Sequence, residues 1–99
     1  MRIISRKALR TFWEHSKYAD SEQALKAWYD EATKAEWKTP NEIKAQYKNA
    51  SILKGGRVVF NVHGNSYRLV VKINYDFSVL YIRFVGTHEA YDKINAEEV

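Results

Sequence analysis

The feature that most constrains the fold is a period-two alternation of apolar and polar residues through the second half of the chain. Three runs alternate in this way, and residues typical of tight turns separate them. The pattern predicts strands over 58–62, 66–75 and 79–85, with a turn at Gly64–Asn65 and another over 75–78. Because short turns join neighbouring strands in opposite directions, we expect an antiparallel sheet.

The first half of the chain has the spacing of helices. Apolar residues recur three and four positions apart after Ser5 and again after Ser21, and each serine is a candidate helix cap. The run Thr39-Pro40-Asn41-Glu42 has the order of a capping box and opens a third helix that extends to about Tyr47. Thr87 is placed to cap a short last helix, whereas residues 2–5 fit either a first strand or a lead-in. The fold class predicted is α+β, with N-terminal helices packed on one face of a small antiparallel β-sheet and a short C-terminal helix.

The turns also fix which residues face each other across the sheet. The first turn pairs Asn61 with Arg68 and Arg57 with Lys72. The second pairs Lys72 with Tyr81 and Val70 with Arg83. In the last strand the apolar positions Leu80, Ile82 and Phe84 are predicted to face the core, and Tyr81, Arg83 and Val85 the opposite side. One face of the sheet should therefore carry a polar, basic set of side chains: Arg57, Asn61, Arg68, Lys72, Tyr81 and Arg83.

Composition narrows the classes of function. The chain of 99 residues has the length of one domain, 1–99, and a net charge of +4. Without cysteine it has no disulfide, thiolate zinc site or cysteine nucleophile. No signal peptide or membrane-spanning run is visible, so we expect a cytoplasmic protein with no membrane partner. Residues 43–75 carry only basic charges, which indicates either a polyanion partner or a solvated basic face.

A metal site finds little support. The three histidines, His15, His63 and His88, are far apart in sequence and form no known ligand spacing. No glycine-rich phosphate loop or catalytic triad is present. We therefore expect no metal and no cofactor, and His63, next to Gly64, is interpreted first as a turn residue.

Two longer motifs resemble a known family. These are Phe60-Asn61-Val62-His63-Gly64-Asn65-Ser66-Tyr67-Arg68-Leu69-Val70-Val71-Lys72-Ile73-Asn74-Tyr75 and Tyr81-Ile82-Arg83-Phe84-Val85-Gly86-Thr87-His88-Glu89-Ala90-Tyr91-Asp92-Lys93-Ile94. Both resemble the HigB-type toxins of the RelE superfamily, whose fold agrees with the predicted order of elements. The resemblance implies a metal-independent endoribonuclease that cuts messenger RNA in the ribosomal A site. It also implies a cognate antitoxin of helix-turn-helix type, and contact with operator DNA only through the toxin–antitoxin complex.

The resemblance and the chemistry of RNA cleavage together nominate site residues. Arg68 occupies the arginine position of the middle strand, Tyr91 occupies the tyrosine position near the end, and His88 stands where some relatives carry arginine. Cleavage needs a base, an acid and cations that stabilise the charged phosphorane. A histidine side chain ordinarily titrates near neutral pH, so His88 is assigned to general acid or base catalysis, with the choice left open.

The other candidates support these three. Lys72 shares a face with Arg68 and is expected to assist at the phosphate, while Asp92, four residues after His88, could orient the imidazole. Further contacts with RNA are expected from Lys54, Arg57, Asn61 and Arg83. Several candidates also have a structural interpretation. Arg68 and Arg83 could be plain solvent-facing strand residues, and His88 could be only a first-turn helix residue. Tyr91 could cover the edge of the core, and Asp92 could be a surface acid that pairs with a lysine.

Two other classes of function remain open. One is a non-catalytic basic module that inhibits translation by occupying RNA or the ribosome. The other is a structural protein whose sheet face docks a partner protein.

Overall fold

The computed structural model describes residues 1–99 and contains five strands, four α-helices and one 3-10 helix. In chain order the elements are β1 (Arg2–Ile4), α1 (Arg6–Glu14), η1 (Ser16–Ser21), α2 (Glu22–Lys34), α3 (Pro40–Gln46), β2 (Ser51–Ile52), β3 (Arg57–Val62), β4 (Tyr67–Asn74), β5 (Val79–Thr87) and α4 (His88–Asp92). The strand order in the sheet is β1-β5-β4-β3-β2. No helix is long and apolar enough to cross a membrane.

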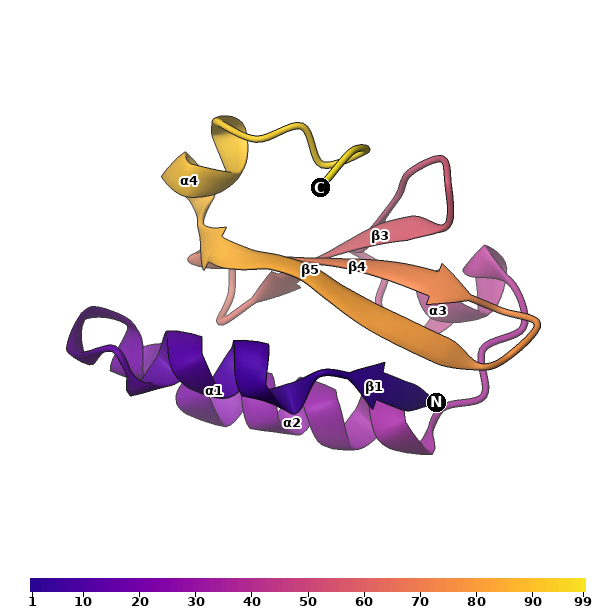
Figure 1. The fold of residues 1–99 in the computed structure, drawn as a ribbon, viewed down its shortest axis with the longest axis horizontal. Coiled ribbons are helices and arrows are strands. Elements are labelled where there is room, and N and C mark those ends of the chain that lie inside the picture. The colour runs from indigo at the N-terminus through magenta and orange to yellow at the C-terminus, as the bar shows by residue number, and fades with distance from the viewer.

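The sheet separates two unequal layers (Figure 1). Helices α1 and α2 lie along one face, and the short α4 with the C-terminal residues lies on the other. The main core forms on the α1 and α2 side, where Leu9 and Leu25 from the helices and Phe60, Leu69 and Leu80 from the strands are fully or almost fully buried. Removal of this apolar surface from water is the main stabilising contribution to the fold.

The α+β class and the three antiparallel hairpin strands are confirmed. Strand β3 pairs with β4 in the predicted register, with Asn61 opposite Arg68 and Arg57 opposite Lys72. The sheet as a whole is mixed rather than antiparallel, because β1 runs parallel to β5. These two strands are joined by most of the chain rather than by a tight turn, so nothing in the local sequence dictates their relative direction.

A β-bulge makes one predicted pairing wrong. Lys72 faces Tyr81 as expected, but Val70 pairs with Phe84 instead of Arg83. The extra residue, Arg83, shifts the alternation that follows it. Phe84 therefore faces away from the main core and packs over Gly86, whereas Val85 packs against that core, the reverse of the prediction.

Local chemistry explains the helix ends. Glu42 accepts a hydrogen bond from the backbone N–H of Thr39 at 2.9 Å, as the capping box predicts. Thr87 caps α4 by accepting from the N–H of Ala90 at 3.0 Å. Ser5 and Ser21 stand at the predicted N-cap positions of α1 and α2, but neither side chain makes a capping hydrogen bond. The buried hydroxyl of Ser21 donates instead to the carbonyl of Tyr18 at 2.7 Å, within the unpredicted η1.

Candidate nucleic-acid interface

The face of the sheet that α4 covers, which we call the α4 face, carries the predicted polar set. Its side chains are Arg57, Asn61, Arg68, Lys72, Tyr81 and Arg83, contributed by three adjacent strands. The face is not uniformly open, because Val59 and Val70 from its central strip are 3% and 0% exposed although both lie outside the main core cluster. The polar residues are consequently divided between the two ends of the sheet.

Four candidates meet where β5 passes into α4, and we call them the α4 cluster: Arg68, His88, Tyr91 and Asp92. The Nδ1 atom of His88 lies 3.3 Å from Oδ2 of Asp92, one helical turn later. Both side chains are more than half exposed, at 52% and 61%. The contact leaves Nε2 of His88 free to face a ligand, which is the arrangement that a proton-transfer group needs.

Arg68 joins this cluster from the neighbouring strand. Its guanidinium carbon lies 5.9 Å from the centre of the Tyr91 ring, a cation–π contact, and its Nη1 donates to the carbonyl of Asn65 at 3.3 Å. A guanidinium held in this way can stabilise a phosphorane, and the exposed imidazole of His88, three residues before Tyr91 on α4, can move a proton.

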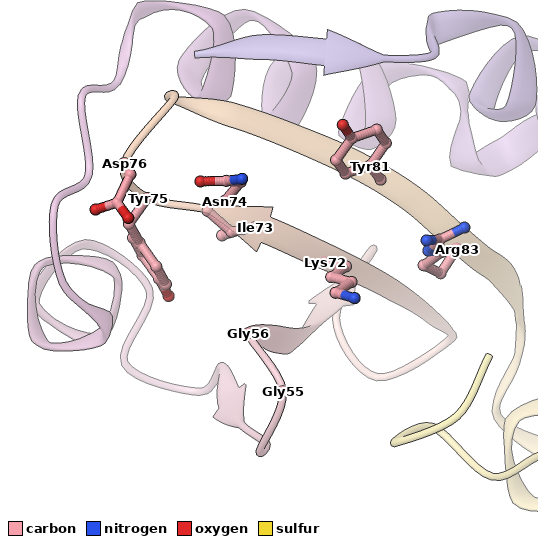
Figure 2. A pocket seen from close by; sticks show the side chains of 9 residues that line it. All are labelled: Gly55, Gly56, Lys72, Ile73, Asn74, Tyr75, Asp76, Tyr81 and Arg83. Atoms are coloured by element: carbon pink, nitrogen blue, oxygen red, sulfur yellow. The ribbon is translucent and has the colours of Figure 1, made fainter.

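The structure does not bring Lys72 to the same phosphate. Lys72 is four residues from Arg68 along β4, which corresponds to about 13 Å of extended strand. Instead it lines an open groove of about 690 Å³ together with Tyr81 and Arg83. The residues that line this Tyr81 groove are Gly55, Gly56, Lys72, Ile73, Asn74, Tyr75, Asp76, Tyr81 and Arg83 (Figure 2).

Two predicted RNA contacts are occupied by the end of the chain. Arg57 donates from Nε and Nη2 to the carbonyl oxygen of Val99, at 3.1 and 2.8 Å. Lys54 lies 3.2 Å from a carboxylate oxygen of Glu97, although the Lys54 side chain is 84% exposed. These two cations hold the C-terminal residues against the α4 face, so RNA could reach Arg57 only after Val99 moved away.

Asn61 is also engaged, through a hydrogen bond from Nδ2 to the carbonyl of Asn49 at 3.3 Å. It borders a small pocket of about 250 Å³ with Tyr47 and Phe60. The prediction that Asn61 contacts RNA therefore has no specific support from its surroundings.

Sequence reasoning missed the contribution of η1. Lys17 and Tyr18 from this element line a pocket of about 510 Å³ that His88 also borders, so a second cation lies beside the α4 cluster. The 3-10 segment has no helical periodicity in its sequence, and its position opposite His88 depends on tertiary packing.

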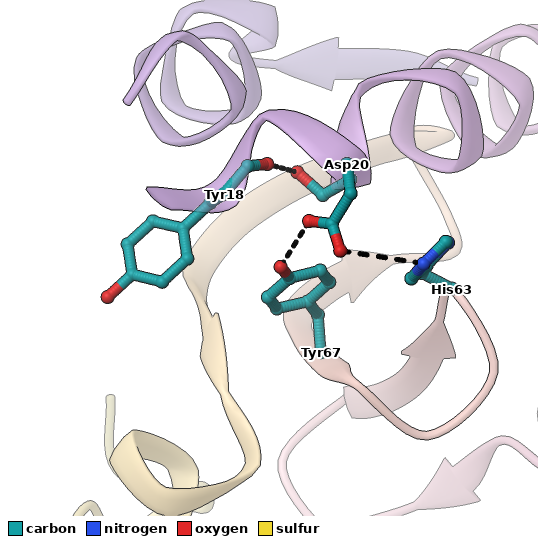
Figure 3. Close-up of polar contacts among 5 residues, drawn as sticks. Tyr18, Asp20, His63 and Tyr67 are labelled. Atoms are coloured by element: carbon teal, nitrogen blue, oxygen red, sulfur yellow. Dashed lines mark hydrogen bonds and ion pairs between the residues drawn. The ribbon is translucent and has the colours of Figure 1, made fainter. Parts of the chain in front are cut away.

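A polar network ties η1 to the β3–β4 turn (Figure 3). The Asp20 carboxylate accepts the phenolic hydroxyl of Tyr67 and lies 3.6 Å from Nε2 of His63. The hydrogen bond to Asp20, followed by burial, raises the pKa of Tyr67 to about 12. His63 has a positive φ of 55° next to Gly64, which supports its interpretation as a turn residue.

No three His, Cys, Asp or Glu side chains lie close enough together to hold a metal ion. The groups gathered at the α4 cluster are instead an imidazole, a guanidinium, a phenol and a carboxylate. Together they can perform proton transfer and stabilise an anion at a phosphate.

The chain is similar to known proteins over most of its length. A family model described as HigB_toxin, the RelE-like toxic component of a toxin-antitoxin system, matches residues 21–94. The mRNA interferase toxin HigB of Escherichia coli strain K12 is 34% identical over 98 residues, which cover 97% of this chain and 92% of that protein. The proteins called mRNA interferase HigB in Escherichia coli O157:H7 and Shigella flexneri match with the same identity and coverage. The family match includes all four residues of the α4 cluster.

Proposed function

The chain belongs to the HigB family of RelE-like toxins, and we propose from this that it is the toxin of a toxin–antitoxin pair and an endoribonuclease that cleaves messenger RNA. The single observation that carries the chemistry is the α4 cluster, where His88 contacts Asp92 and Arg68 contacts the partly buried ring of Tyr91 on the same short helix. The chain is 34% identical, over 97% of its length, to proteins named mRNA interferase, and this similarity supports messenger RNA as the substrate.

The proposed reaction uses the RNA's own 2′-hydroxyl. Its oxygen attacks the adjacent phosphorus, a base removes its proton, and the 5′-oxygen of the next nucleotide leaves with a proton from an acid. The products are a 2′,3′-cyclic phosphate and a 5′-hydroxyl. The atoms and charges of this reaction balance without a metal ion. His88 Nε2 acts as the base or the acid, and Arg68 donates to the charged phosphorane oxygens.

The two remaining members of the cluster hold the reacting groups. In this mechanism Asp92, whose Oδ2 lies 3.3 Å from Nδ1 of His88, fixes the ring orientation and stabilises the imidazolium when it forms. Tyr91 packs beside the Arg68 guanidinium and offers its ring to a base or its hydroxyl to a phosphate oxygen. Asp92 is thus a positioning residue, whereas Arg68, His88 and Tyr91 touch the substrate.

Membership in a toxin–antitoxin family implies a cognate antitoxin. Our proposal extends this to an antitoxin with a helix-turn-helix domain, through which alone the complex would contact operator DNA. It also places the substrate on translating ribosomes, hence in the cytoplasm. The cationic groups on the α4 face support contact with a polyanion.

Expression of the chain without its antitoxin tests the proposal. The wild type should arrest growth and cut translated messages, and an Arg68→Ala, His88→Ala double variant should do neither. A double variant that still arrests growth without cutting RNA would favour the alternative, a non-catalytic module that blocks RNA or the ribosome. A Lys7→Ala, Arg10→Ala variant, altered at two exposed positions of α1, is the control.

A further inference from the structure

We propose that the Tyr81 groove binds one nucleobase of the RNA and prefers guanine. This inference rests on the proposed function for the identity of the polymer, but not for the chemistry of the groove. The groove lies on the α4 face at the end of β4 away from the α4 cluster, so it would hold a nucleotide other than the two at the scissile bond.

The floor of the groove is kept free of side chains by two glycines. Gly56 has a φ of +76°, and a Cβ atom there would lie 2.8 Å from the carbonyl oxygen of Ile73. Gly55 has a φ of +73°. The two glycines therefore let this loop turn tightly against β4, and at these two positions backbone rather than side chain lines the groove.

The wall of the groove offers a stacking surface beside cations. The Arg83 guanidinium carbon lies 5.6 Å from the centre of the Tyr81 ring, and Lys72 faces Tyr81 directly across the strands. Single-stranded RNA is commonly recognised by stacking of its bases on aromatic rings and guanidinium planes, with lysine on the backbone. Alternation along β5 places Arg83 on the same face as Tyr81, and the bulge leaves Arg83 without a residue paired opposite it on β4.

Hydrogen-bonding groups lie at the other end of the groove (Figure 2). Asn74 Oδ1 accepts from the N–H of Phe77 at 3.2 Å, which orients the amide and leaves its nitrogen free to donate. Asp76 is exposed, forms no ion pair and is the one acidic residue that lines the groove. A carboxylate repels phosphate but accepts well from N–H donors of a base, so its presence favours a base over a phosphate at this end.

Guanine fits this donor and acceptor set better than the other bases. Its Watson–Crick edge presents two neighbouring donors, N1–H and N2–H, beside the acceptor O6. A carboxylate can accept from both donors while the Asn74 amide donates to O6. Adenine and cytosine offer only an amino donor on this edge, and uracil offers a single N–H between two acceptors.

Titration of the full-length protein with mononucleotides, followed by amide NMR, tests the proposal. Guanosine 5′-monophosphate should shift the resonances of the groove residues and bind at least about fivefold more tightly than adenosine 5′-monophosphate. Inosine 5′-monophosphate, which lacks the N2 amino group, should bind with intermediate affinity. Asp76→Asn should remove the preference for guanine, and Asp30→Asn, the same charge change at an exposed site on α2, should retain it.

Three outcomes would overturn the proposal. The guanosine and adenosine nucleotides could bind with equal affinity, or the resonance shifts could be confined to other parts of the protein. The preference for guanine could also survive in Asp76→Asn. These outcomes are independent of RNA cleavage. If the wild type cuts RNA but does not discriminate mononucleotides, only the base site is refuted. If the groove selects guanine but no RNA is cut, the proposed function fails and the base site stands.

Discussion

His88 Nδ1 lies 3.3 Å from Asp92 Oδ2, across one turn of a helix of only five residues. The contact engages Nδ1 and leaves Nε2 of His88 without a partner in the chain. Thr87 fixes the start of this helix by accepting from the N–H of Ala90, so the cap, the imidazole and the carboxylate form one local unit. This unit follows directly after β5, and its position next to Arg68 depends on the pairing of β4 with β5.

If Asp92 acts by orienting His88, the shape of its side chain matters more than its charge. Asp92→Asn keeps an oxygen that can accept from Nδ1–H, so we expect a fall in the cleavage rate of about tenfold or less. Asp92→Ala removes the acceptor and should lower the rate by about 100-fold, the lower end of what acid–base catalysis contributes. Single-turnover cleavage rates on one defined message measure both. Equal losses in the two variants would show that orientation is not the role of Asp92.

Arg68 should need its guanidinium and not only its positive charge. Arg68→Lys loses bidentate donation and the planar contact with the Tyr91 ring, and we expect it to recover little of the activity that Arg68→Ala loses. Tyr91→Phe keeps the ring beside Arg68, so it should be more active than Tyr91→Ala. Cleavage rates of the four variants, with Arg10→Lys as a control on the exposed side of α1, test this pair. Full activity in Arg68→Lys would mean that a point charge suffices.

The Tyr67–Asp20 contact should stabilise the fold and give it a defined dependence on alkaline pH. Tyr67 is 6% exposed, and Tyr67→Phe leaves Asp20 without its phenolic donor, which should cost about 1.5–3 kcal/mol in the free energy of unfolding. Urea denaturation at neutral pH measures this loss. Tyr81→Phe, whose hydroxyl has no partner in the chain, is the control.

The sign of the pH effect follows from the raised pKa. The hydrogen bond to Asp20 and burial raise the pKa of Tyr67 from 10.0 to about 12, so the unfolded chain releases the phenolic proton first. The protonated Tyr67 hydroxyl contributes fully to the free energy of unfolding below pH 10, and this contribution is lost as the pH rises to about 12. Tyr47 and Tyr75 also have raised pKa values, mainly through burial, so Tyr67→Phe should reduce the alkaline slope without abolishing it. An unchanged slope in Tyr67→Phe would contradict this assignment.

Arg57 should behave as an anchor of the C-terminal residues. Arg57→Ala removes both hydrogen bonds to Val99 and should increase amide hydrogen exchange over residues 95–99, with a loss of about 1 kcal/mol in stability. Lys54→Ala breaks only an exposed ion pair and should change stability by less than about 1 kcal/mol. If Arg57 is instead free to bind RNA, its removal should leave the exchange of residues 95–99 unchanged.

The sequence predicts well those features that local periodicity controls. Alternation and the Gly64 turn gave the β3–β4 register, and the Thr87 cap gave the start of α4. Proximity of His88 and Asp92 followed from helical spacing alone. The resemblance nominates Arg68 and Tyr91 as site residues without relating their positions, and the structure brings them into cation–π contact.

The features that were missed depend on tertiary structure. The bulge at Arg83 leaves no mark on the alternation of apolar residues, so Phe84 and Val85 were assigned to the wrong faces. The 3-10 segment that brings Lys17 near His88 has no periodic pattern, and the contact from Arg57 to Val99 spans 42 positions of sequence. Lys72 and Arg68 share a face of the sheet but lie too far apart to contact the same phosphate. Alternation along the strand predicts the shared face and not this separation.

The central claim, cleavage by attack of the RNA 2′-hydroxyl with His88 transferring a proton, is tested most directly by the chemical structure of the cut ends. Message cut by the wild-type protein should carry a 2′,3′-cyclic phosphate on the upstream fragment and a 5′-hydroxyl on the downstream one. His88→Ala should slow the appearance of these ends by at least about 100-fold. A 3′-hydroxyl paired with a 5′-phosphate, or an undiminished rate in His88→Ala, would contradict the mechanism.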